Sequence, residues 1–224
     1  MLGSMFDIRY FLEVLPKIAV KLNVTMEITV IALIFSLLLG FLLAIITYYK
    51  VKILYPIVKA YISFMRGTPI VAQLYFFYFG IAMFSEIVRN MTPIYAVSIV
   101  MSLNFAAFMS ESMRAALISV DEGQKEAAYS LGMSRVQMTV RILLPQAIRV
   151  ALPPLSNDII NLIKMSALSF MLGVSDIMGA AKIEGARTFR YFEIYAAVML
   201  IYWCIIFVFG CLHKYIEKRC ASIY

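Results

Sequence analysis

The chain has 224 residues, of which 63% are hydrophobic and 15% charged, and its formal net charge is +7. Soluble domains average about 45–50% apolar and about 25% charged residues, whereas apolar runs near the length of a bilayer crossing recur here. A soluble protein with a large core is therefore excluded, and one all-α integral membrane domain is expected. Its cations fall mainly in loops, where they set membrane orientation rather than nucleic-acid binding.

The N-terminal segment 5–21 is predicted to be an amphipathic, interfacial helix. Phe6, Tyr10, Val14 and Ile18 recur at helical spacing, with charged residues between them. A frayed terminus is the alternative interpretation. The segment lacks the unbroken apolar core of a cleavable signal peptide, so none is expected.

About five membrane-spanning helices are predicted. Their expected bounds are 24–49, 57–84, 93–117, 153–174 and 191–212. In the first span, Ser36 and Gly40 lie four residues apart and should let another helix approach closely. In the second, Pro69 should kink the helix, because it leaves the carbonyl of Met65 without its usual donor. The fourth span is expected to open at Pro153-Pro154.

The segment 119–150 is the longest polar interlude between spans. Glu126-Ala127-Ala128 favours a helix, Gly132 can end or bend it, and Ser134 is a possible N-cap of a second short helix that runs to Pro145. Two short helices joined at a glycine would make a docking knob at the membrane surface. A merely solvated loop is the alternative.

Lysine and arginine are more frequent in the loops on the side of segment 119–150 than in those on the other side. The positive-inside rule then places this segment in the cytoplasm. With five spans, the N-terminus is expected outside and the C-terminus in the cytoplasm.

Three blocks of the sequence carry a family resemblance. The spacing of Glu126-Ala127-Ala128, three residues, Gly132, nine residues and Ile142-x-Leu144-Pro145 resembles the EAA loop of bacterial ABC importer permeases. Two further blocks resemble the polar amino-acid subfamily of these permeases: Phe64-Met65-Arg66-Gly67-Thr68-Pro69 with Gln73-Leu74 and Tyr78-Phe79-Gly80, and Leu144-Pro145-Gln146-Ala147 with Leu152-Pro153-Pro154-Leu155 and Asn157.

The resemblance implies a multi-pass protein of the bacterial inner membrane that forms a dimer with an identical or a similar permease chain. A dimer of cytoplasmic ABC ATPases would drive it, and an extracytoplasmic amino-acid-binding protein would deliver the substrate. ATP and Mg would bind to the ATPase, and no cofactor or metal is expected on this chain, whose sequence has no GxxxxGK[ST] loop. Glu126, Ala127, Ala128 and Gly132 would form the helix that couples it to the ATPase.

Polar side chains inside the spans form stripes at helical spacing. Because such groups are costly in a bilayer, they are expected to face a cavity or to pair with one another. A substrate path between the second, third and fourth spans is therefore predicted from Arg66, Thr68, Gln73, Asn104, Glu111, Asn157, Asp158, Asn161 and Lys164. The alternative is that Arg66–Glu111 and Lys164–Asp158 are buried ion pairs that hold the bundle or dimer together.

The sequence thus predicts the transmembrane subunit of an ATP-driven amino-acid importer. A membrane enzyme is disfavoured, because the single histidine, His213, ends the last span and no paired intramembrane carboxylates occur at a sensible spacing. A membrane scaffold and an exporter component remain as alternatives. Residues 165–171 and 179–182 look most similar to cystine-type members, and the identity of the amino acid stays open.

Overall fold

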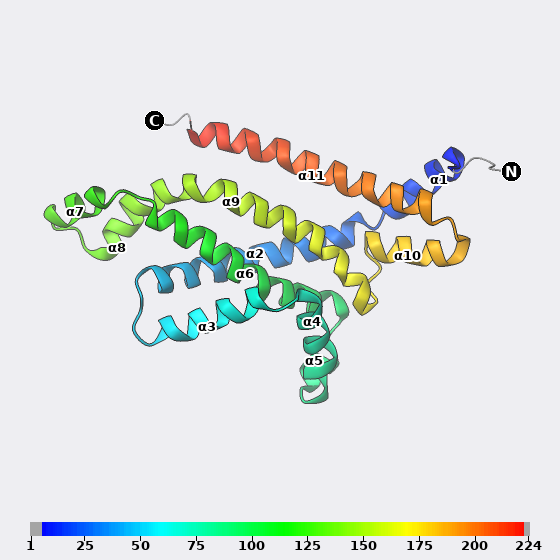
Figure 1. Ribbon diagram of the computed structural model, residues 1–224, viewed down its shortest axis with the longest axis horizontal. Helices are drawn as coiled ribbons and strands as arrows, with labels where there is room; N and C mark the ends of the chain where they lie inside the picture. The colour runs from blue at the N-terminus through cyan, green and yellow to red at the C-terminus, as the bar shows by residue number, and fades with distance from the viewer. Residues whose placement is uncertain (1–5, 222–224) are drawn as a thin grey trace. The chain divides into compact units, whose positions relative to one another are not determined.

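The computed structural model describes residues 6–221, with side chains to residue 218, and every regular element in that range is helical (Figure 1). Met5, the first residue of the predicted interfacial helix, lies outside this range. The helices are α1 (Ile8–Ala19), α2 (Leu22–Tyr48), α3 (Leu54–Gly67), α4 (Ile70–Tyr75), the π-helical η1 (Phe76–Gly80), the 3-10 turn η2 (Ile81–Met83), α5 (Glu86–Arg89), α6 (Pro93–Ile118), α7 (Glu122–Ser130), α8 (Arg135–Met138), the π-helical η3 (Thr139–Leu143), α9 (Leu144–Met165), the 3-10 helix η4 (Ser166–Leu172), α10 (Ile177–Thr188) and α11 (Tyr191–Ala221).

Three of the described helices, α2, α6 and α11, are long and apolar enough to cross a membrane. A fourth crossing is formed if residues 135–172 and α10 count as one bent span. The all-helical, multi-pass prediction is therefore confirmed for three to four spans. The expected span 57–84 is divided into α3, α4, η1 and η2. Pro69 separates α3 from α4, because it interrupts the helical hydrogen-bond ladder.

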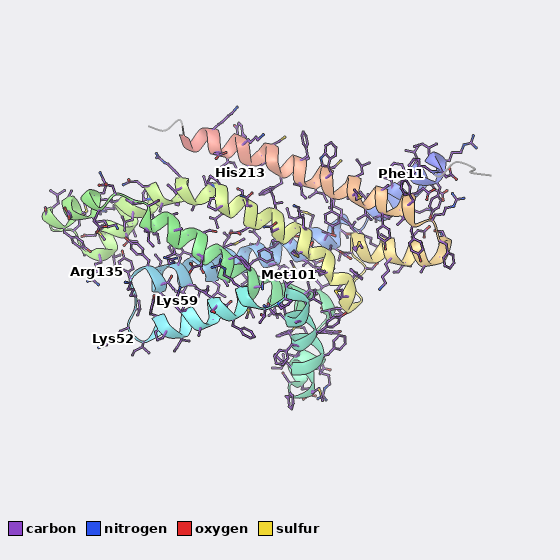
Figure 2. All side chains as sticks on the ribbon, viewed as in Figure 1. Phe11, Lys52, Lys59, Met101, Arg135 and His213 are labelled. Carbon is purple, nitrogen blue, oxygen red and sulfur yellow. The ribbon has the colours of Figure 1, made fainter. Side chains whose placement is uncertain are left out.

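The chain divides into two compact units. Unit 1 takes the described parts of 1–32, 70–101 and 160–211, and unit 2 those of 33–69, 102–159 and 212–224. Each unit has a buried apolar core, and many other apolar side chains are exposed. Met101 of α6 is fully buried, whereas Lys59 of α3 and Arg135 of α8 are exposed (Figure 2). The two units are described in turn.

In unit 1, α1 packs against α10 and α11. Val14 and Ile18 are buried in a cluster with Ile177, Ala181 and Ile194. Part of the apolar face of α1 is therefore buried against α10 and α11, in a core within the protein.

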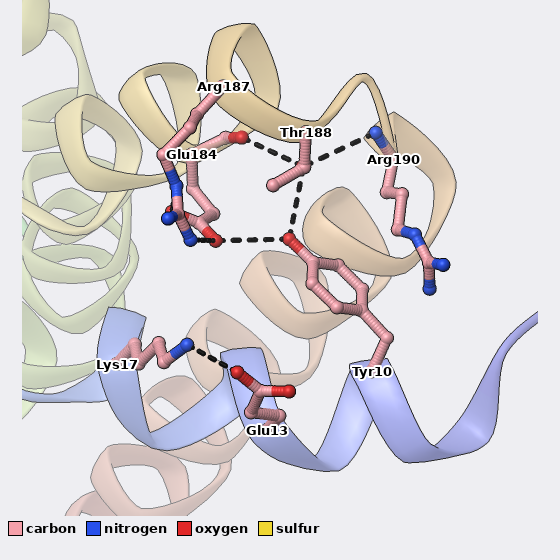
Figure 3. Close-up of polar contacts among 7 residues, drawn as sticks. All are labelled: Tyr10, Glu13, Lys17, Glu184, Arg187, Thr188 and Arg190. Atoms are coloured by element: carbon pink, nitrogen blue, oxygen red, sulfur yellow. Dashed lines mark hydrogen bonds and ion pairs between the residues drawn. The ribbon is translucent and has the colours of Figure 1, made fainter.

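Beside this cluster, polar contacts connect α1 to α10 (Figure 3). The Tyr10 hydroxyl lies 3.1 Å from Glu184 Oε1 and 3.0 Å from Thr188 Oγ1, and Arg187 pairs with Glu184 at 2.7 Å. Asp7 accepts from the Arg9 and Tyr10 amides as the N-cap of α1, and it also pairs with Arg190 at 2.6 Å. The start of α1 is thereby attached to both ends of the α10–α11 turn.

Unit 2 holds the close helix contact that Ser36 and Gly40 predict. The Ser36 hydroxyl donates to the Ser102 carbonyl at 3.1 Å, and a Cβ at Gly40 would lie 3.2 Å from the Ala106 carbonyl oxygen. Small residues thus let α2 approach the backbone of α6. Beside them, the Tyr61 hydroxyl of α3 donates to the Leu103 carbonyl at 2.6 Å.

Candidate functional site

The segment after α6 forms a capped pair of short helices in unit 2. Asp121 is the N-cap of α7, where its carboxylate accepts from the Gly123 amide at 2.8 Å. Gly132 ends the helix with φ +72°. Its amide donates to the Tyr129 carbonyl, and the Met133 amide donates to the Ala128 carbonyl. This pair of bonds is the Schellman motif, which favours glycine at the position of positive φ.

The second helix of the pair begins as the sequence predicts. Ser134 caps α8 by accepting from the Gln137 amide, while the Gln137 side chain accepts from the Ser134 amide. This reciprocal capping box satisfies two amides that a helix start would otherwise leave without partners. The predictions that Gly132 ends one helix and that Ser134 is the N-cap of the next are confirmed.

The predicted end of that helix is wrong. The helical path does not stop at Pro145, but continues through η3 into α9, which contains Pro145, Pro153 and Pro154. Nor does a helix open at Pro153. A proline ring clashes with the carbonyl four residues earlier, and the wide π-helical turn just before Pro145 absorbs that conflict. Packing of the apolar face of α9 outweighs the cost of the two interior prolines.

A small apolar core holds the loop in place. Ala128 is 1% exposed and clusters with Leu117 of α6, Met138 of α8 and Leu143 of η3. Glu126 and Ala127 are exposed. Of the residues predicted for ATPase coupling, Ala128 therefore faces the chain's own core and Gly132 shapes the turn, while Glu126 and Ala127 present a free surface.

Two tyrosines at the end of α2 tie this loop to a membrane span. The Lys125 ammonium lies 5.5 Å from the centre of the Tyr48 ring, and it pairs with Glu122 at 2.7 Å. The carboxylate of Glu122 raises the pKa of Lys125, so the cation is favoured. The Tyr49 hydroxyl is hydrogen-bonded to Thr139 Oγ1 of η3. Sequence reasoning missed both tyrosines, although aromatic residues at the end of an apolar span are typical interfacial anchors.

The break at Pro69 brings two predicted path residues into defined contacts. Asn104 Nδ2 donates to the Met65 carbonyl at 3.0 Å, and Asn104 is 5% exposed. The Thr68 hydroxyl donates to the Phe64 carbonyl at 2.8 Å. The kink is thus stabilised by side chains that bond main-chain carbonyls next to it.

The predicted ionisable residues of unit 2 find other partners than the sequence suggested. Glu111 forms its ion pair with Arg114 at 2.6 Å, and the Arg66 guanidinium lies over the Phe108 ring at 5.4 Å. Asp158 accepts from the Ser112 hydroxyl at 2.9 Å. The alternative pair Arg66–Glu111 is therefore replaced by a pair within α6.

The remaining path residues are distributed as follows. Asn157 is exposed in unit 2, while Gln73 is half-buried and Asn161 and Lys164 are exposed in unit 1. Unit 2 thus brings six of the predicted residues into one unit: Arg66, Thr68, Asn104, Glu111, Asn157 and Asp158. In the same unit, the His213 ring lies 2.6 Å from the Ser156 hydroxyl, so it links α11 to α9.

The chain is similar in sequence and fold to known proteins. The chain is 41% identical to the probable amino-acid ABC transporter permease protein PatM of Vibrio harveyi, with 98% of each chain covered. It is 35% identical to the L-cystine transport system permease protein TcyL of Bacillus subtilis (strain 168), covering 96% of this chain and 91% of that one. A crystal structure of an amino acid ABC transporter with histidines superimposes with a TM-score of 0.87 at 31% identity, covering 96% of this chain and 99% of the other.

The family described as "Binding-protein-dependent transport system inner membrane component" matches residues 14–222. This match covers α7, α8 and the helices to which they are attached. The chain therefore belongs to the family of binding-protein-dependent transport system inner membrane components, the multi-pass permeases of ABC transporters.

Proposed function

We propose that this chain is the transmembrane subunit of an ATP-driven importer of amino acids, and that α7 is the element on which the motor acts. The observation that carries the proposal is the capped pair α7–α8, which is built onto a core shared with α6 and α9 and is tied to α2. Because the α7–α8 pair is packed rigidly against α2, α6 and α9, a movement of the ATPase at α7 would be transmitted to these helices as a rigid-body shift.

Within the knob, Glu126 and Ala127 are the proposed contact with a cytoplasmic ABC ATPase. Both are exposed, and a carboxylate can accept a charge-assisted hydrogen bond from a partner arginine or lysine. Ala128 and Gly132 act indirectly, since one seats α7 on the loop core and the other ends it. ATP and Mg would bind to the ATPase, where hydrolysis takes place.

The proposed topology has about five spans, with α1 at the interface. The N-terminus lies outside and the C-terminus lies in the cytoplasm, as the distribution of lysine and arginine favours. The working assembly contains a second permease chain, identical or similar, together with an ATPase dimer. An extracytoplasmic binding protein delivers the substrate.

The proposed cargo is an amino acid. Support comes from PatM, which is named a probable amino-acid ABC transporter permease, and from TcyL, which is named for L-cystine. Cystine or another polar amino acid is accordingly the first candidate. In unit 2, the Arg66 guanidinium would bind a carboxylate, and Glu111 or Asp158 would face an ammonium group. Gln73, Asn161 and Lys164 stay predictions from the sequence.

The test is uptake by vesicles that contain the permease, its ATPase and its binding protein, with a panel of labelled amino acids. Glu126→Ala should lower uptake roughly ten- to hundredfold, because a hydrogen bond to a charged group contributes about 1.5–3 kcal/mol. Ser130→Ala is the matched control, because Ser130 is exposed on the same helix and its hydroxyl bonds a main-chain carbonyl of that helix. Equal uptake by the Glu126 variant and the wild-type protein would contradict the coupling role.

The same assay tests the substrate path. Gln73→Ala, Arg66→Gln and Asp158→Asn should each raise the substrate concentration needed for half-maximal uptake while the complex stays assembled. Ser112→Ala, which only removes a partner of Asp158, should have a smaller effect. Outward movement of solute on ATP addition, or no movement of any amino acid, would instead support the exporter or scaffold alternatives.

A further inference from the structure

A basic pocket lies beside the α7–α8 pair in unit 2. Its volume is about 310 Å³, within the range of about 300–1,000 Å³ of small-ligand sites. It is lined by residues of α7, η3 and the first turns of α9: Gln124, Arg141, Ile142, Pro145, Gln146 and Arg149.

The chemistry of this lining is that of an anion site. Two of the six lining residues are arginines, two are amides and none is acidic. Arginine presents a planar set of donors that matches the oxygens of a phosphate group. The Gln146 amide nitrogen already donates to the Ile142 carbonyl at 3.1 Å, which fixes that side chain in the wall.

An apolar groove lies along the same helix. It has a volume of about 330 Å³, and every lining residue is apolar: Phe41 of α2, Met113 and Leu117 of α6, and Leu144, Ala147, Ile148, Ala151, Leu152 and Leu155 of α9. Ile148, which lines the groove, precedes Arg149, which lines the basic pocket, and Ile148 is 55% exposed. The basic pocket and the apolar groove are therefore adjacent on α9.

The groove and the basic pocket overlap along α9. The α9 residues that line the groove run from Leu144 to Leu155, and those that line the pocket run up to Arg149. From Arg149 to Leu155 the helix rises about 9 Å at about 1.5 Å per residue, less than the half-thickness of about 15 Å of a hydrocarbon core. The first part of an acyl chain whose phosphate lies on the pocket would thus lie in the groove.

We propose that an anionic phospholipid binds here, with its phosphodiester on Arg141 and Arg149 and one acyl chain in the groove. Charge complementarity selects this occupant, since a zwitterionic lipid brings no net charge to two guanidinium groups. A soluble anion would leave the groove uncovered. Bound there, the lipid would brace α9 against α2 and α6 at the base of the α7–α8 pair.

The experiment uses the full-length chain purified in detergent. Native mass spectrometry measures the binding of phosphatidylglycerol and of phosphatidylcholine with the same acyl chains. We expect phosphatidylglycerol to bind at least tenfold more tightly. Arg141→Gln and Arg149→Gln should each weaken its binding about fivefold, as expected for one basic group at an anionic lipid surface, and should weaken phosphatidylcholine binding less.

Arg135→Gln is the matched control, because Arg135 is exposed on α8 and does not line the pocket (Figure 2). Equal binding of the two lipids, or unchanged phosphatidylglycerol binding by the double arginine variant, would overturn the proposal. A loss in Arg135→Gln as large as in the pocket variants would also overturn it, by showing non-specific attraction.

Two further measurements separate the sources of the phosphate group. Inorganic phosphate should compete for the site only weakly, and equal competition would show a soluble-anion site instead. The second measurement repeats the assay on the permease bound to its ATPase. Retention of phosphatidylglycerol in that complex supports the lipid site, whereas its displacement would show that the ATPase occupies the basic pocket.

Discussion

Asn104 Nδ2 donates a 3.0 Å hydrogen bond to the carbonyl of Met65. In an unbroken helix the amide of residue 69 would donate to that carbonyl, but residue 69 is a proline and has no N–H. A side chain on α6 thereby replaces a main-chain bond that α3 and α4 cannot make. This contact gives Asn104 a structural role at the kink, beside its predicted place in the substrate path.

Asn104→Leu should lower the free energy of unfolding by about 0.5–1.5 kcal/mol, the net worth of one hydrogen bond. If the contact compensates for Pro69, the loss should shrink in a Pro69→Ala background, where the amide of residue 69 can donate to Met65. The measurement is a double-mutant cycle on thermal or denaturant unfolding of the purified chain. Strictly additive effects would show that Asn104 stabilises the chain in another way.

Gly132→Ala should destabilise the α7–α8 pair by about 1–2 kcal/mol, because a Cβ is disfavoured at φ +72°. Gly132→Asn should cost less, since asparagine tolerates the left-handed region. Hydrogen exchange of the α7 amides reports the local opening. Gly210→Ala is the control: a Cβ there meets no atom within 4 Å, and the site lies inside α11. A similar cost at both positions would contradict the role of the positive φ.

Tyr49→Phe should loosen the attachment of η3 to α2 by about 0.5–1.5 kcal/mol, since it removes the hydrogen bond to Thr139. Thr139→Val should cost more, because it also removes the bond from the Thr139 hydroxyl to the Arg135 carbonyl, and the double variant should cost little more than Thr139→Val alone. In vesicles with the ATPase, we expect less uptake per ATP hydrolysed. If both single variants transport at the wild-type ratio, this contact does not carry force.

The attachment of α1 should depend on pH through Asp7. The Arg190 guanidinium beside it holds the pKa of the Asp7 carboxyl below its usual value of 3.8. A group with a lowered folded-state pKa stabilises the fold above its unfolded pKa, and that contribution is lost as the pH falls through the folded pKa. The attachment should thus be intact above about pH 4 and weaken in more acidic solution.

This dependence is measured as the distance between spin labels on Arg9→Cys of α1 and Ile183→Cys of α10, with the native cysteines replaced by serine. Asp7→Asn should weaken the attachment at neutral pH and remove the part of the acid response that Asp7 causes. Glu184 and Glu193 are present in both proteins, so they do not account for a difference between them. Glu13→Gln, which breaks a pair internal to α1, should leave the distance as in wild type.

Local features of the fold could be predicted from the sequence alone. The apolar runs determine a multi-pass helical membrane protein, because a bilayer accepts little else. The spacing of Ser36 and Gly40 predicts a close helix contact, and Gly132 and Ser134 mark the end of one helix and the start of the next. These features depend on residues a few positions apart, so their physical causes are contained within short segments.

Only the tertiary structure decided which groups meet across helices. In the structure, Ala128 is buried in the chain's own core and Glu111 pairs with Arg114. Helix α9 continues past Pro145, Pro153 and Pro154. The tertiary structure also joined Tyr48 and Tyr49 to the α7–α8 pair. Each outcome depends on how helices distant in the sequence pack and in what register, and that register results from the summed contacts of many side chains rather than from any one segment.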